Sequence, residues 1–549
     1  MWLMSDFTGT VARARARTGD HDWAEAADLW SQVTAANPVN GDYWARLGEA
    51  RFGAQDYTGA REAYEQALRL RLRNPEWTDD APPLMPGEIA YRIACCEAAA
   101  GQREAAVAAL VAALDRGMRD PGRIRTDELW AELRADQRVR DMAGIIDTGS
   151  MSRDDGWRYD LAFLAREIKR LAYAPFATWP EAQFDRAVAE LDAAIPGLTG
   201  PQILVAMMKL IRHLDDGHAR IRWPEGDQEL ARMLPVDLFL FPEGLYVIGA
   251  GPGCEHLLGA RVDKIGGLTV DQAMAAMDPV MTRDNEHWLT WLFPSLVRYP
   301  AILDGLGIDH ALTVVRPGGT TDEVRLKAEP VTFRLDRYSP GWTALADTVT
   351  EPRPLHLRHR ELPFWFEYQP ADDLVYFQFN AVRDHPAETF AAFCDRLFGF
   401  IEDHNAARLV IDVRWNGGGN TFLSQHLLHH LIASQRLRRR GALFVIIGRL
   451  TFSAAQNTVT AIERETSAIF VGEPTGSRPN FIGEAIDFEL PYSKLRANVA
   501  DLFWQTSWPL DYRTWTAPDL YAPPTFEAYR RNLDPALDAI RATREHLPG

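Results

Sequence analysis

The sequence predicts an α/β domain in the C-terminal part of the chain, preceded by a β module and, at the N-terminus, by an array of helices. Three observations carry this prediction. Residues 1–145 are rich in alanine and repeat with a period of 34 residues, which is typical of stacked helical pairs. Residues 235–330 contain short β-like segments separated by glycine turns. From about residue 355, short apolar runs alternate with helical segments, which indicates a mixed, mostly parallel sheet with flanking helices.

Composition restricts the class of protein. The chain has 549 residues, which is too long for one core, and its charged (25%) and hydrophobic (46%) fractions are those of a soluble globular protein. The formal net charge of −17 argues against a nucleic-acid partner, because binding phosphates requires a basic surface. The N-terminus lacks the apolar core of a signal peptide, and no apolar run approaches the roughly 20 residues of a membrane span. We therefore expect a cytoplasmic protein.

The cysteines indicate neither a disulfide framework nor a zinc site. Only four are present, two of them adjacent, and none forms a CxxC pair: Cys95, Cys96, Cys254 and Cys394. We expect no cofactor and no metal.

The N-terminal repeats span residues 1–148. Three positions match across the 34-residue period, Ala26, Trp30 and Val33 in one unit and Ala60, Tyr64 and Ala67 in the next, and a third unit follows a proline-rich loop. Trp44, Leu47 and Gly48 supply a W-x2-L-G pattern. The segment resembles about three tetratricopeptide repeats, which favours this interpretation over a plain helical bundle. Such arrays bind peptides or partner proteins, so we expect a partner or substrate to bind here.

Residues 149–224 are predicted to form a helical subdomain that ends in Asp215-Asp216-Gly217-His218. This motif stops the last helix and leaves His218 on a turn before a short strand. A lone histidine is more often a surface residue than a catalytic one, and the two aspartates beside it are only suggestive. Residues 225–332 are predicted to form a PDZ-like β module with a helical insert near residues 285–303.

Residues 333–549 are predicted to form the α/β domain. The run Phe444–Ile447 is short and wholly apolar, as expected for a strand buried on both faces, and residues 454–463 have helical composition. Ser453 therefore lies at the carboxyl edge of a sheet, where a serine can act as a nucleophile. The alternative is that Ser453 only caps the helix, as serine most often does.

A glycine-rich turn, Gly417-Gly418-Gly419, follows another buried strand at Arg408–Val413. Consecutive glycines allow backbone N–H groups to face a cleft. A phosphate-binding loop is excluded, because neither G-x-x-x-x-G-K-[ST] nor G-x-G-x-x-G is present.

Four motifs in order carry a family resemblance. They are Asp412-Val-Arg-Trp-Asn-Gly-Gly-Gly419, Phe452-Ser-Ala-Ala455, Gly472-Glu-Pro-Thr-Gly476 and Pro518-Asp519. From about Trp157 to its end the chain resembles the S41 serine peptidases, which include the C-terminal processing peptidases and the tricorn core. The resemblance implies a ClpP/crotonase-like catalytic domain that cleaves peptide bonds. It also implies Ser453 as nucleophile and an oxyanion hole made by the N–H groups of Ala454 and Gly418.

The sequence departs from the processing peptidases at their general base. The position of their catalytic lysine holds Arg478, which stays protonated at neutral pH, and Lys494 is the only lysine left in this domain. The tricorn core uses a histidine instead, at the place where His218 stands. The resemblance then implies Asp511 as the acid that orients His218, with Glu484 as the second candidate. A histidine held by a carboxylate has the pKa range and geometry to activate a serine.

Three functions remain open from the sequence. The first is a tricorn-like serine peptidase. The second is a ligand- or peptide-binding protein on the same fold, because fold does not fix function. The third is a scaffold in which the repeats are the working part. The intact Ser453, glycine turn and His218 favour the first.

Overall fold

The structure is a computed structural model that describes residues 2–70, 85–222, 230–330 and 341–543, with side chains from residue 7. The chain separates into two compact units. Unit 1 comprises residues 1–171 together with 490–493, and unit 2 comprises residues 172–489 and 494–549. The unit boundary falls inside the helical segment expected to begin at residue 149. The three boundaries between the four expected domains stay a prediction, and those near residues 225 and 333 lie in segments outside the described residues.

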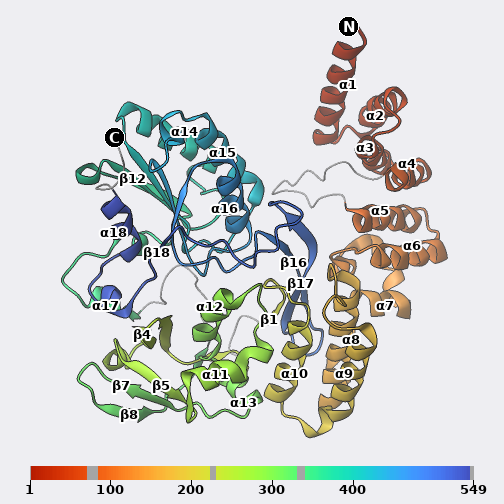
Figure 1. The fold of residues 1–549 in the computed structure, drawn as a ribbon. Coiled ribbons are helices and arrows are strands. Elements are labelled where there is room, and N and C mark those ends of the chain that lie inside the picture. The colour runs from red at the N-terminus through yellow and green to blue at the C-terminus, as the bar shows by residue number, and fades with distance from the viewer. Residues whose placement is uncertain (1, 71–84, 223–229, 331–340, 544–549) are drawn as a thin grey trace. The chain divides into compact units, whose positions relative to one another are not determined.

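Unit 1 begins with the expected array of helical hairpins (Figure 1). Its helices are α1 (Trp2–Gly19), α2 (Trp23–Ala36), α3 (Gly41–Gly53), α4 (Tyr57–Leu70), α5 (Pro86–Ala99) and α6 (Arg103–Asp115). The matched repeat positions on α2 and α4 are all buried. Gly48 is required by the packing, since a β-carbon there would lie 2.8 Å from the ring of Tyr64. Most of the inserted proline-rich loop lies outside the described residues.

The rest of unit 1 contains short 3-10 helices between residues 121 and 150, the helices α7 (Gln137–Ala143) and α8 (Arg153–Leu171), and the segment 490–493. Asp160 on α8 is fully buried, and its carboxylate accepts the backbone N–H groups of Tyr492 and Ser493, both at 2.7 Å. These two bonds satisfy the charge of a carboxylate that burial would otherwise make costly.

The central sheet of unit 2 is mixed and mostly parallel, as predicted. Its strand order is β11-β12-β13-β14-β15-β18, and only the β11–β12 pair is antiparallel. The strands are β11 (Phe364–Gln369), β12 (Leu374–Phe379), β13 (Arg408–Asp412), β14 (Leu443–Ile447), β15 (Ile469–Gly472) and β18 (Leu520–Tyr521). Every residue of β12, β13, β14 and β15 is buried, which explains their unbroken apolar runs.

Alternate residues of these strands face two different layers. Phe377, Ile411 and Val445 pack with α14 (Phe390–Asp403), α15 (Ser424–Ala433) and α16 (Ala454–Glu465) on one face. Tyr376 and Phe444 pack with α18 (Pro535–Ala542) on the other face. Figure 1 shows α18 on the opposite side of the sheet from α14, α15 and α16. The sheet is therefore covered on both sides, so the free backbone at its carboxyl edge is where a site can form.

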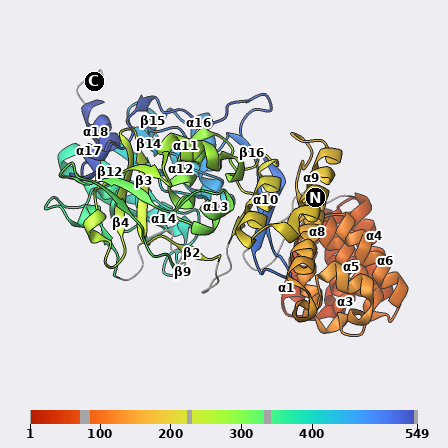
Figure 2. The same ribbon diagram turned by 90° about the horizontal axis from the view of Figure 1, so that it is seen from below.

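The expected β module is an antiparallel sheet with strand order β10-β4-β5-β7-β8, in which β3 also pairs with β4 and β6 with β5. Its strands are β3 (Val236–Phe241), β4 (Gly244–Ala250), β5 (Arg261–Ile265), β6 (Leu268–Thr269), β7 (Leu312–Val315), β8 (Thr321–Val324) and β10 (Thr343–Ala344). A short helix, α11 (Val270–Met277), follows β6. The expected helical insert is α12 (Glu286–Leu296) and α13 (Pro300–Gly305), and α12 packs along β3 (Figure 2).

A third sheet joins distant parts of the sequence. In it, β1 (Arg220–Arg222) pairs with β17 (Arg496–Gln505), which pairs with β16 (Asn480–Glu489). The helices α9 (Glu181–Ala194) and α10 (Gly200–Arg212) precede β1, while β2 (Arg232–Met233) and β9 (Glu329–Pro330) form a separate pair.

All four cysteines are buried, unbridged thiols. In the described part of the chain, no helix has the length and apolar character to cross a membrane.

Candidate active site

Ser453 stands at the join between β14 and α16, at the carboxyl edge of the sheet. Its backbone is left-handed, with φ 55° and ψ −126°, a conformation that costs a residue with a side chain about 1–3 kcal/mol. Thr451 fixes the turn that imposes this conformation, because its hydroxyl accepts the Gly448 N–H and donates to the Val413 carbonyl, both at 3.0 Å. The Ser453 side chain makes no capping hydrogen bond to α16. The structure therefore does not use Ser453 as a helix cap.

The glycine turn lies directly against Ser453. A β-carbon on Gly418, whose φ is 112°, would lie 2.7 Å from the Ser453 Cβ and 3.1 Å from its Oγ. Asn416 holds the turn from inside, since its side chain is fully buried and donates to the Phe379 carbonyl at 3.0 Å. Only glycine at position 418 leaves room for the serine hydroxyl.

The two predicted oxyanion donors differ in availability. Ala454 provides the first N–H of α16, and among the described residues this N–H has no acceptor. The Gly418 N–H donates to the side-chain oxygen of Asn416 at 2.9 Å. The structure thus brings Ser453, Ala454 and Gly418 together, with one donor free and the other bonded to a neighbouring side chain.

His218 lies on the turn between α10 and β1, as predicted, and is 9% exposed. Its ring rests against the ring of Phe452, the residue before Ser453, at a centroid distance of 4.5 Å, and stacks on Phe481 at 5.5 Å. Neither ring nitrogen has a hydrogen-bond partner among the described residues. His218 therefore reaches the chain segment of Ser453 but does not hydrogen-bond its hydroxyl.

The carboxylate nearest in sequence to His218 is also the one that pairs with it. Oδ1 of Asp216 lies 3.5 Å from His218 Nδ1 and accepts the backbone N–H of His218 at 2.7 Å. Asp216 is itself 2% exposed. A buried carboxylate at this distance can orient the imidazole and stabilise its protonated form.

A second buried carboxylate, Asp284, supports the turn from behind. It accepts the Gly217 N–H at 2.8 Å and the hydroxyl of Ser477 at 2.5 Å. Burial raises the pKa of Asp284, although the charge of His218 and the hydrogen bond from Ser477 act in the opposite direction. Asp284 lies in a loop before α12, where sequence reasoning offered no signal for it.

Arg478, at the position of the lysine in the processing peptidases, ties the same turn to the sheet. Its Nε donates to the Asp284 carbonyl at 2.8 Å, and its Nη2 pairs with Asp215 at 2.9 Å. Lys494, the alternative base, forms an ion pair with Glu489 at 3.3 Å. The arginine is therefore a clamp on the turn that carries His218.

The structure does not bring Asp511 to His218. Its carboxylate accepts the hydroxyl of Ser507 at 2.6 Å and pairs with Arg513 at 2.8 Å. The hydrogen bonds from Arg513 lower the pKa of Asp511 well below its usual range, outweighing a smaller effect of burial. Asp511 thus pairs within its own loop, whereas the carboxylate beside the His218 ring is that of Asp216, and the identity of the acid that orients His218 stays a prediction. The second candidate, Glu484, stands at an irregularity in β16 with φ 67° and does not hydrogen-bond the His218 ring.

The chain is similar to known proteins in structure but not in sequence. No family model matches the sequence, and no curated protein does. Mature CPAF complexed with lactacystin is similar in structure at 13% identity and a TM-score of 0.49, over 71% of this chain and 98% of that one. The photosystem II D1 C-terminal processing protease has 15% identity and a TM-score of 0.33, over 72% and 97%. The tricorn protease has 14% identity and a TM-score of 0.34, over 72% of this chain and 37% of that chain.

Proposed function

We propose that the chain is a serine hydrolase that cleaves peptide bonds through an acyl-enzyme, with Ser453 as the nucleophile. The single observation that carries this proposal is the backbone of Ser453. It is held left-handed at a sheet edge, makes no capping bond, and meets a glycine whose β-carbon would leave no room for the hydroxyl. Strain kept at one half-buried serine is typical of a functional position.

The chemistry follows from the groups around the hydroxyl. The Ser453 Oγ attacks the substrate carbonyl carbon while His218 accepts the hydroxyl proton. The negative oxygen that forms is stabilised by the Ala454 N–H and, once it leaves Asn416, by the Gly418 N–H. Protonated His218 then donates to the leaving amine, and a water molecule hydrolyses the acyl-enzyme by the reverse sequence.

His218 is proposed as the general base, with Asp216 orienting it. The ring lies against Phe452, the residue before Ser453, and the proposed reaction requires the DDGH turn to bring it to the hydroxyl. Catalytic hydrogen bonds are often long before substrate binds and shorten in the complex. Asp284 and Arg478 limit that movement because they hold the turn at Gly217 and at Asp215 and are hydrogen-bonded to each other.

Unit 1 is proposed to bind a segment of the substrate or of a partner protein, the common use of helical-hairpin arrays. The cytoplasmic location expected from the sequence stays a prediction.

A binding protein on the same fold is the second candidate. The observation that favours it is the resting geometry, in which His218 is not bonded to Ser453 and the Gly418 N–H is bonded to Asn416. A protein of this kind would bind peptides without acylation.

Labelling with a fluorophosphonate separates the two candidates, because the reagent reacts only with an activated serine. We expect stoichiometric labelling of the wild type and none of Ser453→Ala. Ser467→Ala, which removes a hydroxyl beyond the far end of α16, is the matched control and should label fully. A folded wild type that stays unlabelled would favour the binding protein, and equal labelling of Ser453→Ala would move the nucleophile elsewhere.

A further inference from the structure

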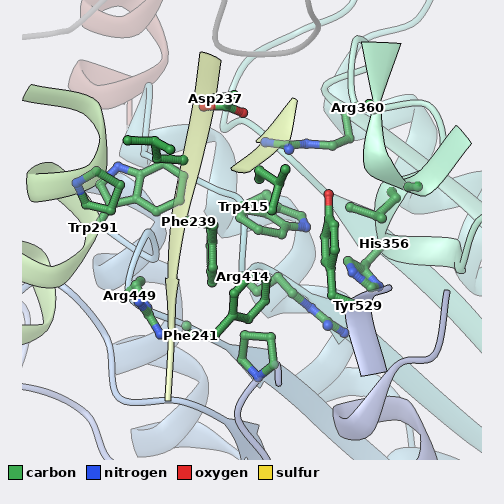
Figure 3. Close-up of a pocket in the computed structure, with 18 of the residues that line it drawn as sticks. Asp237, Phe239, Phe241, Trp291, His356, Arg360, Arg414, Trp415, Arg449 and Tyr529 are labelled. Carbon is green, nitrogen blue, oxygen red and sulfur yellow. The ribbon is translucent and has the colours of Figure 1, made fainter. Parts of the chain in front are cut away.

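The segment between β13 and the glycine turn carries two large side chains, those of Arg414 and Trp415. The next residue, Asn416, holds the turn, because its side-chain oxygen accepts the Gly418 N–H at 2.9 Å. Since the chain is continuous, the position of Gly418 depends on where Arg414 and Trp415 are fixed. Both side chains line a cavity of about 800 Å³ in unit 2, together with His356 (Figure 3).

The guanidinium of Arg414 lies between two buried carboxylates. Its Nη2 lies 2.8 Å from Oδ2 of Asp412, at the end of β13, and its Nη1 and Nη2 donate to the two oxygens of Asp534, both at 2.9 Å. The side chains of Asp412 and Asp534 are 0% and 3% exposed. A double hydrogen bond of this kind fixes the orientation of the guanidinium as well as its position. Asp534 therefore anchors the segment that enters the glycine turn.

Asp534 is itself fixed by the helix that follows it. It is the N-cap of α18, and its Oδ1 accepts the backbone N–H groups of Ala536 at 3.2 Å and Leu537 at 3.4 Å. The helix packs on the sheet through Leu537 and Ile540, which belong to the buried cluster on that face. The anchor of the turn is therefore a residue of a packed helix.

His356 contacts both the anchor and the second side chain of the segment. Its Nδ1 lies 3.2 Å from Oδ2 of Asp534, and its ring stacks on that of Trp415 at a centroid distance of 6.2 Å. His356 is itself buried. The pair of His356 and Asp534 thus holds two consecutive residues of the segment, one by charge and the other by ring contact.

Stability alone is a weak reason for such a network. Taking charges out of water costs about as much free energy as their attraction returns, so apolar side chains of similar volume would stabilise the fold as well. What the charges add is a fixed geometry, and the residues that they fix stand directly before Asn416. An oxyanion donor needs a fixed geometry, because it must lie about 2.7–3.1 Å from the oxygen on which charge develops.

We propose that Asp534 and His356 are positioning residues for the oxyanion turn. Through Arg414 and Trp415 they hold the chain so that the Gly418 N–H stays beside the nucleophile, where the negative oxygen forms. They act through the turn and not on the substrate. This role rests on the proposed function, because the position of the donor affects a rate only where an oxyanion forms.

A double-mutant cycle measures whether Asp534 acts through Gly418. Asp534→Asn keeps the N-cap but removes the charge that holds Arg414, and should lower kcat for a peptide or ester about 10–100-fold, with KM within about threefold of the wild type. Gly418→Ala displaces the same donor, so adding Asp534→Asn to it should lower kcat by less than about threefold more. Full multiplication of the two losses would overturn the positioning role. Glu88→Gln, which takes a carboxylate away from two arginines of unit 1, is the matched control and should leave kcat unchanged.

Hydrogen exchange tests the anchor without any turnover. Asp534→Asn should speed exchange of the amides of residues 414–420 at least about tenfold, while residues 213–222 exchange as in the wild type. His356→Phe, the second variant should Asp534→Asn not fold, keeps a ring against Trp415 but removes the nitrogen that faces Asp534, and should speed the same amides about threefold. Unchanged exchange in 414–420, or an equal increase throughout unit 2, would overturn the proposal. A wild type that neither hydrolyses a substrate nor takes the fluorophosphonate label would refute the proposed function, and exchange alone then decides whether Asp534 holds the turn.

Discussion

The two halves of the candidate active site are built in different ways. The nucleophile half, Ser453, Ala454 and Gly418, comes from two turns that end neighbouring parallel strands, and backbone packing fixes it. The base half centres on His218 and is assembled from α10, the loop before α12 and the segment after β15. Buried carboxylates and one arginine hold it in place.

This difference predicts how each half responds to substitutions that add volume or remove charge. A backbone turn at a sheet edge cannot relax without breaking strand pairing, so the nucleophile half is rigid and tolerates little added volume. A histidine held by ion pairs and hydrogen bonds can shift by rotation, so the base half is adjustable and depends on charge.

The largest effect is expected at the base itself. If His218 takes the proton from Ser453, His218→Ala should lower kcat for a peptide or ester about 10⁴–10⁶-fold, close to the effect of removing the nucleophile. His213→Ala, at the end of the same helix, is the control and should change kcat little, since its ring stacks on Trp179. Comparable activity of the two variants would remove His218 from the mechanism.

Exchanging carboxylates distinguishes Asp216 from Asp511. Asp216→Asn removes the charge beside His218 Nδ1 and should lower kcat about 10²–10⁴-fold. Asp511→Asn should leave kcat nearly unchanged, because that carboxylate serves Ser507 and Arg513. The reverse ranking would restore Asp511 as the orienting acid.

A pair of adjacent glycines tests the rigidity of the nucleophile half. A β-carbon at Gly418 would collide with Ser453, whereas one at Gly417 would meet only Leu450, at 3.8 Å. Gly418→Ala should therefore lower kcat about 10²–10³-fold, the loss expected when an oxyanion donor is misplaced. Gly417→Ala should stay within severalfold of the wild type. Steady-state kinetics on folded variants measures both, and equal values would contradict a tightly packed turn.

Weakening the arginine clamp should have a smaller effect on rate. Arg478→Lys can keep one contact but not both the Asp284 carbonyl and Asp215. We expect kcat to fall about tenfold and the unfolding free energy by about 1–2 kcal/mol. A variant that gains activity at alkaline pH would show instead that the new lysine acts as a base.

Acid should change the local stability of the two halves of the site in opposite directions. Burial alone would raise the pKa of Asp534, but the charge of Arg414 outweighs it and lowers that pKa well below the usual range. Burial, aided by Arg414, also lowers the pKa of His356. Both groups contribute stability that is lost as pH falls, from about 6.5 for the histidine and from about 4 for the carboxylate. Arg414 precedes the Asn416–Gly419 turn, so this loss weakens the nucleophile half.

The contribution of Asp284 to stability changes with pH in the opposite direction, because folding favours the protonated form of this carboxyl and so raises its pKa. Its contribution is present at low pH and is lost as pH rises through its folded-state pKa. Hydrogen exchange at pH 7 and pH 4 should therefore show protection falling at residues 408–420 relative to residues 213–222. Equal loss in both segments would contradict the assignment of these charges.

Several features could be predicted from the sequence because they depend on local pattern. The period of 34 residues is enough to predict helical hairpins, because the matched positions are buried at equivalent places in successive helix pairs. Unbroken apolar runs such as Phe444–Ile447 predict parallel strands buried on both faces. A strand followed directly by a helix then puts Ser453 at the carboxyl edge, and Gly418 follows from the turn after the neighbouring strand.

Only the tertiary structure decided which charged groups lie beside the histidine. Asp511 had the right order along the chain, but its short side chain binds Arg513 two residues away before it can reach anything distant. Asp284 lay in a loop without a motif, and its position depends on how α12 packs along β3. Helix and strand patterns act over a few residues and are visible in sequence. The pairing of buried charges depends on which segments, hundreds of residues apart, exclude water from the same space, and that is set by the fold as a whole.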